Sequence, residues 1–143
     1  MPLFCVLLLG CAAQPVEREV ISTEAAPAAI GPYSQAIRVG SMLFLAGQIA
    51  IDPATGEFIS GGIEEQTHLV LKNIQAVLKA AGFEMKDVVQ SQVFLSDLNN
   101  YAAMNSVYAS YFQEAPPARA AVQAARLPKE ALIEIMVTAV KSR

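Results

Sequence analysis

The sequence predicts one α+β domain in which two helices cover one face of a mixed β-sheet. Two patterns carry this prediction. Apolar residues recur at helical spacing in residues 63–81 and 101–111, whereas they alternate with other residues along 132–140. The expected segments follow the order strands, helix, strand, helix, strands, and a chain of 143 residues has room for one such domain.

Turn residues separate the expected strands. Gly40 and Ser41 form the turn of a first hairpin, and a second turn runs from Asp52 to Gly56. The expected strands are residues 33–39, 42–46, 88–95, 119–123 and 132–140, with short extended segments at 48–51 and 57–59.

The two expected helices differ in what they carry. The first ends at Gly82, and its apolar stripe is Ile63, Val70, Ile74, Val77, Leu78 and Ala81. His68 lies on the opposite, charged face of this helix, which predicts a solvated side chain. The spacing on the second helix predicts core residues rather than a surface for stacking bases; these residues are Tyr101, Met104, Val107, Tyr108 and Tyr111. Spacing alone makes Asn105 an exposed polar residue of the same helix.

The composition excludes several kinds of chemistry. Ten basic and 13 acidic residues give a net charge of −3, and no Lys/Arg cluster follows the pattern that binds a phosphate backbone. Both cysteines, Cys5 and Cys11, precede the domain, which therefore has no thiol nucleophile, disulfide or zinc–thiolate cluster. With a single histidine, no multi-histidine metal centre is expected.

The first 20 residues form a separate segment. Residues 1–13 are apolar and uncharged, and they resemble a short signal-peptide core. Leu8, Leu9, Gly10 and Cys11 resemble a bacterial lipobox, in which Cys11 becomes lipidated. We therefore expect a signal or lipobox-like segment and linker at 1–20, a domain at 21–143, and a periplasmic or membrane-anchored protein. The alternative is a disordered tail or a misassigned start on a cytoplasmic protein.

Residues 116–138 bring one isolated cation and one isolated anion into apolar sequence. Along residues 132–140, alternation places Glu134 on one face with Leu132, Met136 and Val140. A carboxylate among hydrophobic residues must be paired or have a shifted pKa, so Glu134 is either a structural acid or a tuned catalytic one. Because Arg119 is also alone in apolar surroundings, a site for a small carboxylate is the first hypothesis.

Four stretches together resemble the RidA family, also called YjgF or L-PSP. They are APAAIGPYSQ at 26–35, GQI at 47–49, DLN at 97–99 and PARAAVQAARLPKEALIE at 117–134. The similarity extends from Ile21 to Lys141 without a large gap. It implies a chorismate-mutase-like fold, a homotrimer with a site in each cleft between subunits, and hydrolysis of reactive 2-imino or enamine acids to 2-oxo acids and ammonia.

The same resemblance implies a role for each matching residue. Arg119 would bind the substrate carboxylate, which a guanidinium can do bidentately. Glu134 would position and activate water, Tyr33 would line the cleft, the Gly47 backbone N–H would help to hold the carboxylate, and Asn105 would reach the site. An iminium carbon is already electrophilic, so the reaction needs orientation, water and one proton carrier, without a cofactor or metal.

Two positions depart from the family pattern. Ala121 stands where many relatives carry cysteine, which removes a modifiable thiol but keeps the backbone carbonyl that the resemblance places against the attacking water. Ala46 stands where some relatives carry serine or threonine, which removes a hydroxyl near the substrate. We expect this second change to alter selectivity or weaken binding.

Two other functions compete with the deaminase. One is a ribonuclease or translation inhibitor, an activity ascribed to some L-PSP proteins, although an acidic domain without a cationic stripe argues against strong RNA binding. The other is a non-catalytic ligand-binding or chaperone-like trimer, for which Arg119 would be needed and Glu134 would not.

Overall fold

Six strands form one sheet in the order β1-β2-β3-β6-β4-β5 in a computed structural model that describes residues 16–141. The strands are β1 (Arg18–Ile21), β2 (Ala36–Val39), β3 (Met42–Leu45), β4 (Val88–Leu95), β5 (Ala118–Gln123) and β6 (Ile133–Val140). Neighbouring strands are antiparallel except β4 and β5, which are parallel. The sheet is therefore mixed, as predicted.

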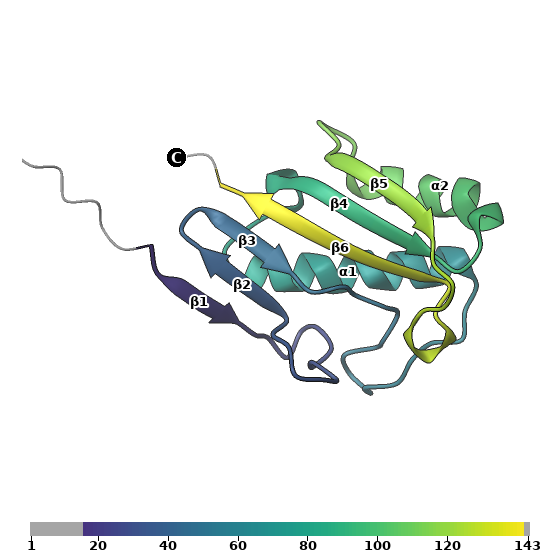
Figure 1. Ribbon diagram of the computed structural model, residues 1–143, viewed down its shortest axis with the longest axis horizontal. Coiled ribbons are helices and arrows are strands. Elements are labelled where there is room, and N and C mark those ends of the chain that lie inside the picture. The colour runs from purple at the N-terminus through teal and green to yellow at the C-terminus, as the bar shows by residue number, and fades with distance from the viewer. Residues whose placement is uncertain (1–15, 142–143) are drawn as a thin grey trace, which may run out of the picture.

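Two α-helices, α1 (Ile63–Ala80) and α2 (Tyr101–Tyr111), pack on the same face of this sheet (Figure 1). The parallel pairing of β4 and β5 requires a crossover, and α2 supplies it. Short 3₁₀ turns at Met85–Asp87, Leu98–Asn100 and Pro128–Glu130 complete the connections. The sequence order of strands and helices is confirmed.

The alternation along β6 decides which side chains form the core. Ile133, Ile135, Val137 and Ala139 are buried under the helices, whereas every intervening residue is half-exposed on the other face. The α1 stripe meets them, since Val70, Ile74, Val77 and Leu78 are completely buried. This packing removes a large apolar area from water and is the main stabilising contribution.

The face of the sheet opposite the helices, here called the open face, carries large apolar side chains that stay exposed within residues 16–141. Cross-strand partners project from the same face, so the register places Val20, Met42, Phe44 and Val122 all on this face. Between 39% and 55% of each of these side chains is exposed. Several exposed apolar side chains on one face of a sheet are typical of an interaction site.

The structure differs from the sequence prediction at the start of the domain. Arg18, Glu19 and Val20, placed above in the linker, belong to strand β1, which pairs with β2 and forms one edge of the sheet. The strand predicted at 33–39 begins only at Ala36, so Tyr33 lies in the preceding loop. Cys11 and the lipobox lie outside the described residues.

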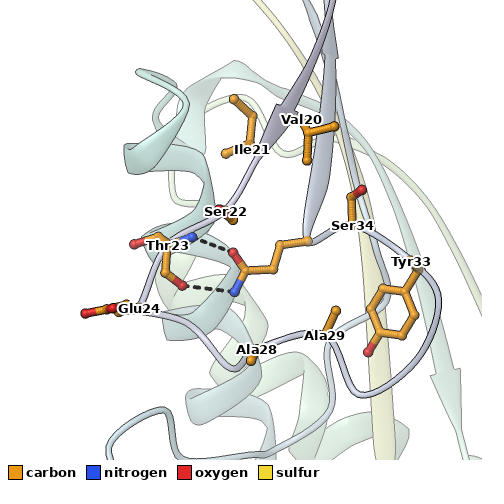
Figure 2. Close-up of a pocket in the computed structure, with 10 residues that line it drawn as sticks. Val20, Ile21, Ser22, Thr23, Glu24, Ala28, Ala29, Tyr33 and Ser34 are labelled. Atoms are coloured by element: carbon orange, nitrogen blue, oxygen red, sulfur yellow. Dashed lines mark hydrogen bonds between the residues drawn. The ribbon is translucent and has the colours of Figure 1, made fainter.

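Hydrogen bonds from Gln35 hold this loop against the sheet. The buried amide of Gln35 accepts from the Thr23 N–H at 2.6 Å and donates to the carbonyls of Thr23, Ala26 and Pro27 at 2.7 to 3.2 Å. Figure 2 shows Thr23 and Tyr33 on the chain that these bonds fix. The loop that carries Tyr33 is thus anchored without regular secondary structure.

The aromatic prediction for α2 is wrong at one position. Tyr108 is buried and Tyr111 half-buried, whereas Tyr101 is 40% exposed because the first turn of α2 lies beside the sheet edge formed by β5. His68 is exposed, as expected, and its Nδ1 lies 3.1 Å from the Tyr111 hydroxyl. Among the residues described, no helix has the length and apolar character needed to cross a bilayer.

Candidate functional site

Glu134 lies in a cavity of about 360 Å³ at one end of β6. The cavity is lined by Ile30, Tyr33, Ala46, Gly47, Ile49, Pro128 and Glu134. Glu134 is the charged group in this lining, and desolvation raises the pKa of its carboxyl above the usual value. A carboxyl tuned in this direction ionises closer to neutral pH, which suits a proton acceptor.

An irregularity in the sheet brings Gly47 against this carboxylate. Phe44 pairs with Thr138 and Gln48 with Ile135, so four steps along one chain oppose three along the other, as in a β-bulge. A Cβ atom built on Gly47 would lie only 2.0 Å from Glu134 Oε1. Residue 47 must therefore lack a side chain if Glu134 is to keep its position.

Tyr33 completes this group from the anchored loop. Its hydroxyl accepts a hydrogen bond from the Ile30 N–H at 3.2 Å, and both residues line the cavity. A second cavity of about 480 Å³ lies on the other side of Tyr33, between β1 and the same loop (Figure 2). Glu24 is the only charged residue in its lining among residues 16–141, and neither Arg119 nor Glu134 belongs to this lining.

Arg119 lies elsewhere, against α2. Its Nη2 donates to the Tyr101 hydroxyl at 3.1 Å, and its Cζ lies 4.6 Å from the Tyr108 ring centroid and 5.6 Å from that of Tyr101. Within residues 16–141 no carboxylate forms an ion pair with it. Its positive charge is therefore held in place by aromatic rings and left available for an anion.

Sheet register shows that Arg119 and Glu134 leave opposite faces. Arg119 pairs with Ser91, and Glu134 pairs with Phe94. Ser91 and Phe94 are three residues apart on β4, so their side chains project in opposite directions. Arg119 thus faces the helix side, and Glu134 faces the open side.

The predicted residues therefore form two groups within one chain. The structure brings Tyr33, Ala46, Gly47 and Glu134 together, and we call these the carboxylate half-site. Arg119 lies with Tyr101, Tyr108 and Asn105, and we call these the guanidinium half-site. No predicted residue joins the two half-sites in a single chain.

Asn105 belongs to the guanidinium half-site rather than to the solvated face that its spacing suggested. Hydrogen bonding by the Asn105 side chain, followed by the charge of Arg119, lowers the pKa of the Tyr101 phenol. Tyr101 and Tyr108 were predicted as core residues and not as site residues. The signal was present, because residues 101, 105 and 108 have the i, i+4, i+7 spacing of one helix stripe.

Ala121 lies two residues beyond Arg119 on the edge strand β5. The Ala124 N–H donates to the Leu95 carbonyl, and in a parallel ladder alternate residues make these bonds. The N–H and C=O groups of Ala121 and Arg119 consequently point away from β4, along the free edge of the sheet. The Ala121 carbonyl is thus available to contact a ligand from that side.

The fold and the two half-sites define a small α+β protein with a guanidinium that no described carboxylate pairs and a separate desolvated carboxyl group. Residues 23–141 match the family model described as Endoribonuclease L-PSP. The chain belongs to this family, also known as RidA or YjgF.

Three relatives illustrate the similarity. A RutC family protein of Pyrococcus horikoshii is 57% identical over 124 residues, which are 87% of this chain and 98% of that protein. The 2-iminobutanoate/2-iminopropanoate deaminase of Mus musculus is 46% identical over 87% of this chain and 92% of its own length. The crystal structure of E. coli TdcF with bound serine has a TM-score of 0.83 and 43% identity, covering 87% of this chain and 99% of that one.

Proposed function

We propose that this protein hydrolyses small 2-imino acids to 2-oxo acids and ammonia at a site shared by two copies of the chain. The observation that carries the proposal is the separation of an anion-binding guanidinium from a desolvated carboxylate on opposite faces of one sheet. Relatives named imine deaminase, and a relative named as holding serine, support a ligand that carries a carboxylate.

Assembly would join the half-sites. A contact in which one patch meets a different patch is heterologous, and repeated heterologous contacts form a ring when the rotation between copies closes. The open face next to Glu134 and the edge strand that carries Arg119 are two such patches, and the apolar side chains on the open face provide area to bury. We therefore propose a homotrimer with one complete site at each interface.

The reaction uses few groups. Arg119 binds the substrate carboxylate with two parallel N–H donors, and the Ala121 carbonyl of the same strand holds the attacking water. Glu134 of the neighbouring copy takes a proton as the water oxygen bonds to the imine carbon. Glu134 passes this proton to the amine nitrogen and then takes the remaining proton from the new hydroxyl. As it does so the C–N bond breaks, ammonia leaves, and the carbon becomes the ketone of the 2-oxo acid.

A complementation experiment tests the shared site. Arg119→Ala and Glu134→Gln chains are each expected to be inactive alone, with rates reduced about 100-fold or more. Trimers assembled from an equal mixture should recover about a quarter of the wild-type rate. Each site takes Arg119 from one copy and Glu134 from another, and about half of the copies in the mixture carry each intact group, so both are intact at about one site in four. The rate is measured with 2-iminobutanoate generated by an amino-acid oxidase, as the release of ammonia.

Two outcomes would contradict this proposal. If the wild-type trimer does not accelerate imine loss, the deaminase reaction is wrong. If each variant alone is inactive and the mixture stays inactive although light scattering shows mixed trimers, the two groups do not come from different copies. RNA cleavage that survives repurification and requires Arg119 would instead favour the ribonuclease.

A further inference from the structure

Tyr101 is the polar neighbour of Arg119 in the guanidinium half-site. The rings of Tyr101 and Tyr108 both lie close to the guanidinium, but the hydrogen bond, at 3.1 Å, is to the Tyr101 hydroxyl. The Tyr108 hydroxyl is buried, and the side-chain hydroxyl beside it is that of Ser91. The two rings therefore have different roles, and only Tyr101 presents a hydroxyl at the accessible surface.

The direction of this hydrogen bond follows from the chemistry of the two groups. A guanidinium has five N–H donors and no acceptor, so the Tyr101 oxygen must accept. Its own O–H proton remains free to donate to another acceptor. Because Asn105 and Arg119 lower the pKa of this phenol, the O–H is also a stronger donor than that of an ordinary tyrosine.

We propose that Tyr101 is a further carboxylate-binding residue, whose O–H donates to the same ligand carboxylate that the Arg119 guanidinium binds. This inference rests on the proposed function and names a residue of that site. Tyr101 thereby acts in two ways: its oxygen fixes the orientation of the guanidinium, and its proton adds a third donor beside the two from Arg119. The carboxylate is held by donors from both β5 and α2.

The test compares Tyr101→Phe with Tyr111→Phe in the intact trimer. Tyr101→Phe keeps the ring and removes only the hydroxyl. Tyr111→Phe also removes a hydroxyl from α2. The Tyr111 hydroxyl contacts the ring nitrogen and the backbone carbonyl of His68 and lies away from Arg119. The probe is 2-oxobutanoate, and its Kd is measured by calorimetry together with kcat and KM for 2-iminobutanoate.

We expect Tyr101→Phe to raise the Kd of 2-oxobutanoate and the KM about tenfold, the size of one hydrogen bond to a charged ligand group. The kcat should change less than about twofold, because the lost bond is made equally in the ground and transition states. Tyr111→Phe should leave all three values unchanged. If the Tyr101→Phe trimer hydrolyses the imine and binds 2-oxobutanoate like the wild type, the proposed role of Tyr101 is overturned. The proposed deaminase function is not affected by that result.

A second measurement does not depend on the folding of Tyr101→Phe. In a Tyr33→Phe background, phenolate absorbance is titrated with and without 2-oxobutanoate. A bound carboxylate that accepts from the Tyr101 O–H should raise the pKa of that phenol, and an unchanged titration with ligand bound overturns the inference. A wild-type trimer that neither binds 2-oxobutanoate nor hydrolyses the imine refutes the proposed function, and the role of Tyr101 with it.

Discussion

Replacing Gly47 with alanine separates the position of Glu134 from the stability of the fold. The new Cβ would lie 2.0 Å from Oε1, 2.9 Å from Cδ and 3.1 Å from Cγ of Glu134, whereas ordinary contacts begin at 3.4 Å. The carboxylate oxygen must therefore retreat by about 1.4 Å. A displacement of roughly 1 Å at a reacting group costs about 100-fold in rate, and we expect a loss of that size in imine hydrolysis.

The same change should affect folding much less. The clashing atoms belong to the end of a flexible side chain that can rotate into the cavity, so we expect the free energy of unfolding to fall by only about 1 kcal/mol. Gly56→Ala is the matched control. Its φ of 73° makes alanine strained by about 1 kcal/mol, while no atom lies within 4 Å of the new Cβ. If Gly47→Ala hydrolyses the imine within about threefold of the wild type, the argument from this contact is wrong.

Three further predictions concern the pKa of Glu134, the open face and the Gln35 anchor. Because desolvation raises the pKa of Glu134 in the folded state, stability should decrease as pH rises from about 4.3 to this higher value. In urea titrations, Glu134→Gln should abolish that decrease in stability. The rate of imine hydrolysis by the wild type should rise over the same pH range. If wild type and Glu134→Gln show the same dependence of stability on pH, this prediction is wrong. Phe44→Lys places a charge on the open face and should give a species of monomer mass by light scattering, so a mass equal to that of the wild type would count against assembly through this face. Gln35→Leu leaves the loop carbonyls without their donor and should cost about 2 kcal/mol in urea denaturation at fixed protein concentration, whereas a change below about 0.5 kcal/mol would show that the anchor is dispensable.

Elements with strong local patterns were predictable from the sequence. The alternation along β6 and the stripe of α1 both report burial directly, and the structure confirms them. Strand β1 was missed because Arg18–Ile21 is short and mostly exposed, and its conformation depends on pairing with the edge of β2. Such a strand is stabilised by a distant partner rather than by its own residues.

The site was predictable as a set of residues but not as an arrangement. Arg119 and Glu134 stand out as isolated charges, yet the faces that they occupy depend on one parallel and one antiparallel register with β4. The contact between Gly47 and Glu134 depends on a bulge, which is also a non-local feature. Tyr101 was assigned to the core because helical spacing identifies the residues that share one side of a helix. It does not show which of them the rest of the protein buries.

Because Arg119 and Glu134 lie on opposite faces of the sheet, the activity of the protein is expected to depend on its assembly. A single copy contains both Arg119 and Glu134, but their side chains project from opposite faces of the sheet. In the proposed trimer, the catalytic rate therefore depends on the fraction of copies that have assembled, so strong dilution should remove activity even from fully folded protein. In a mixed population, a copy damaged at both half-sites disables its own pocket and also one completed by its neighbour.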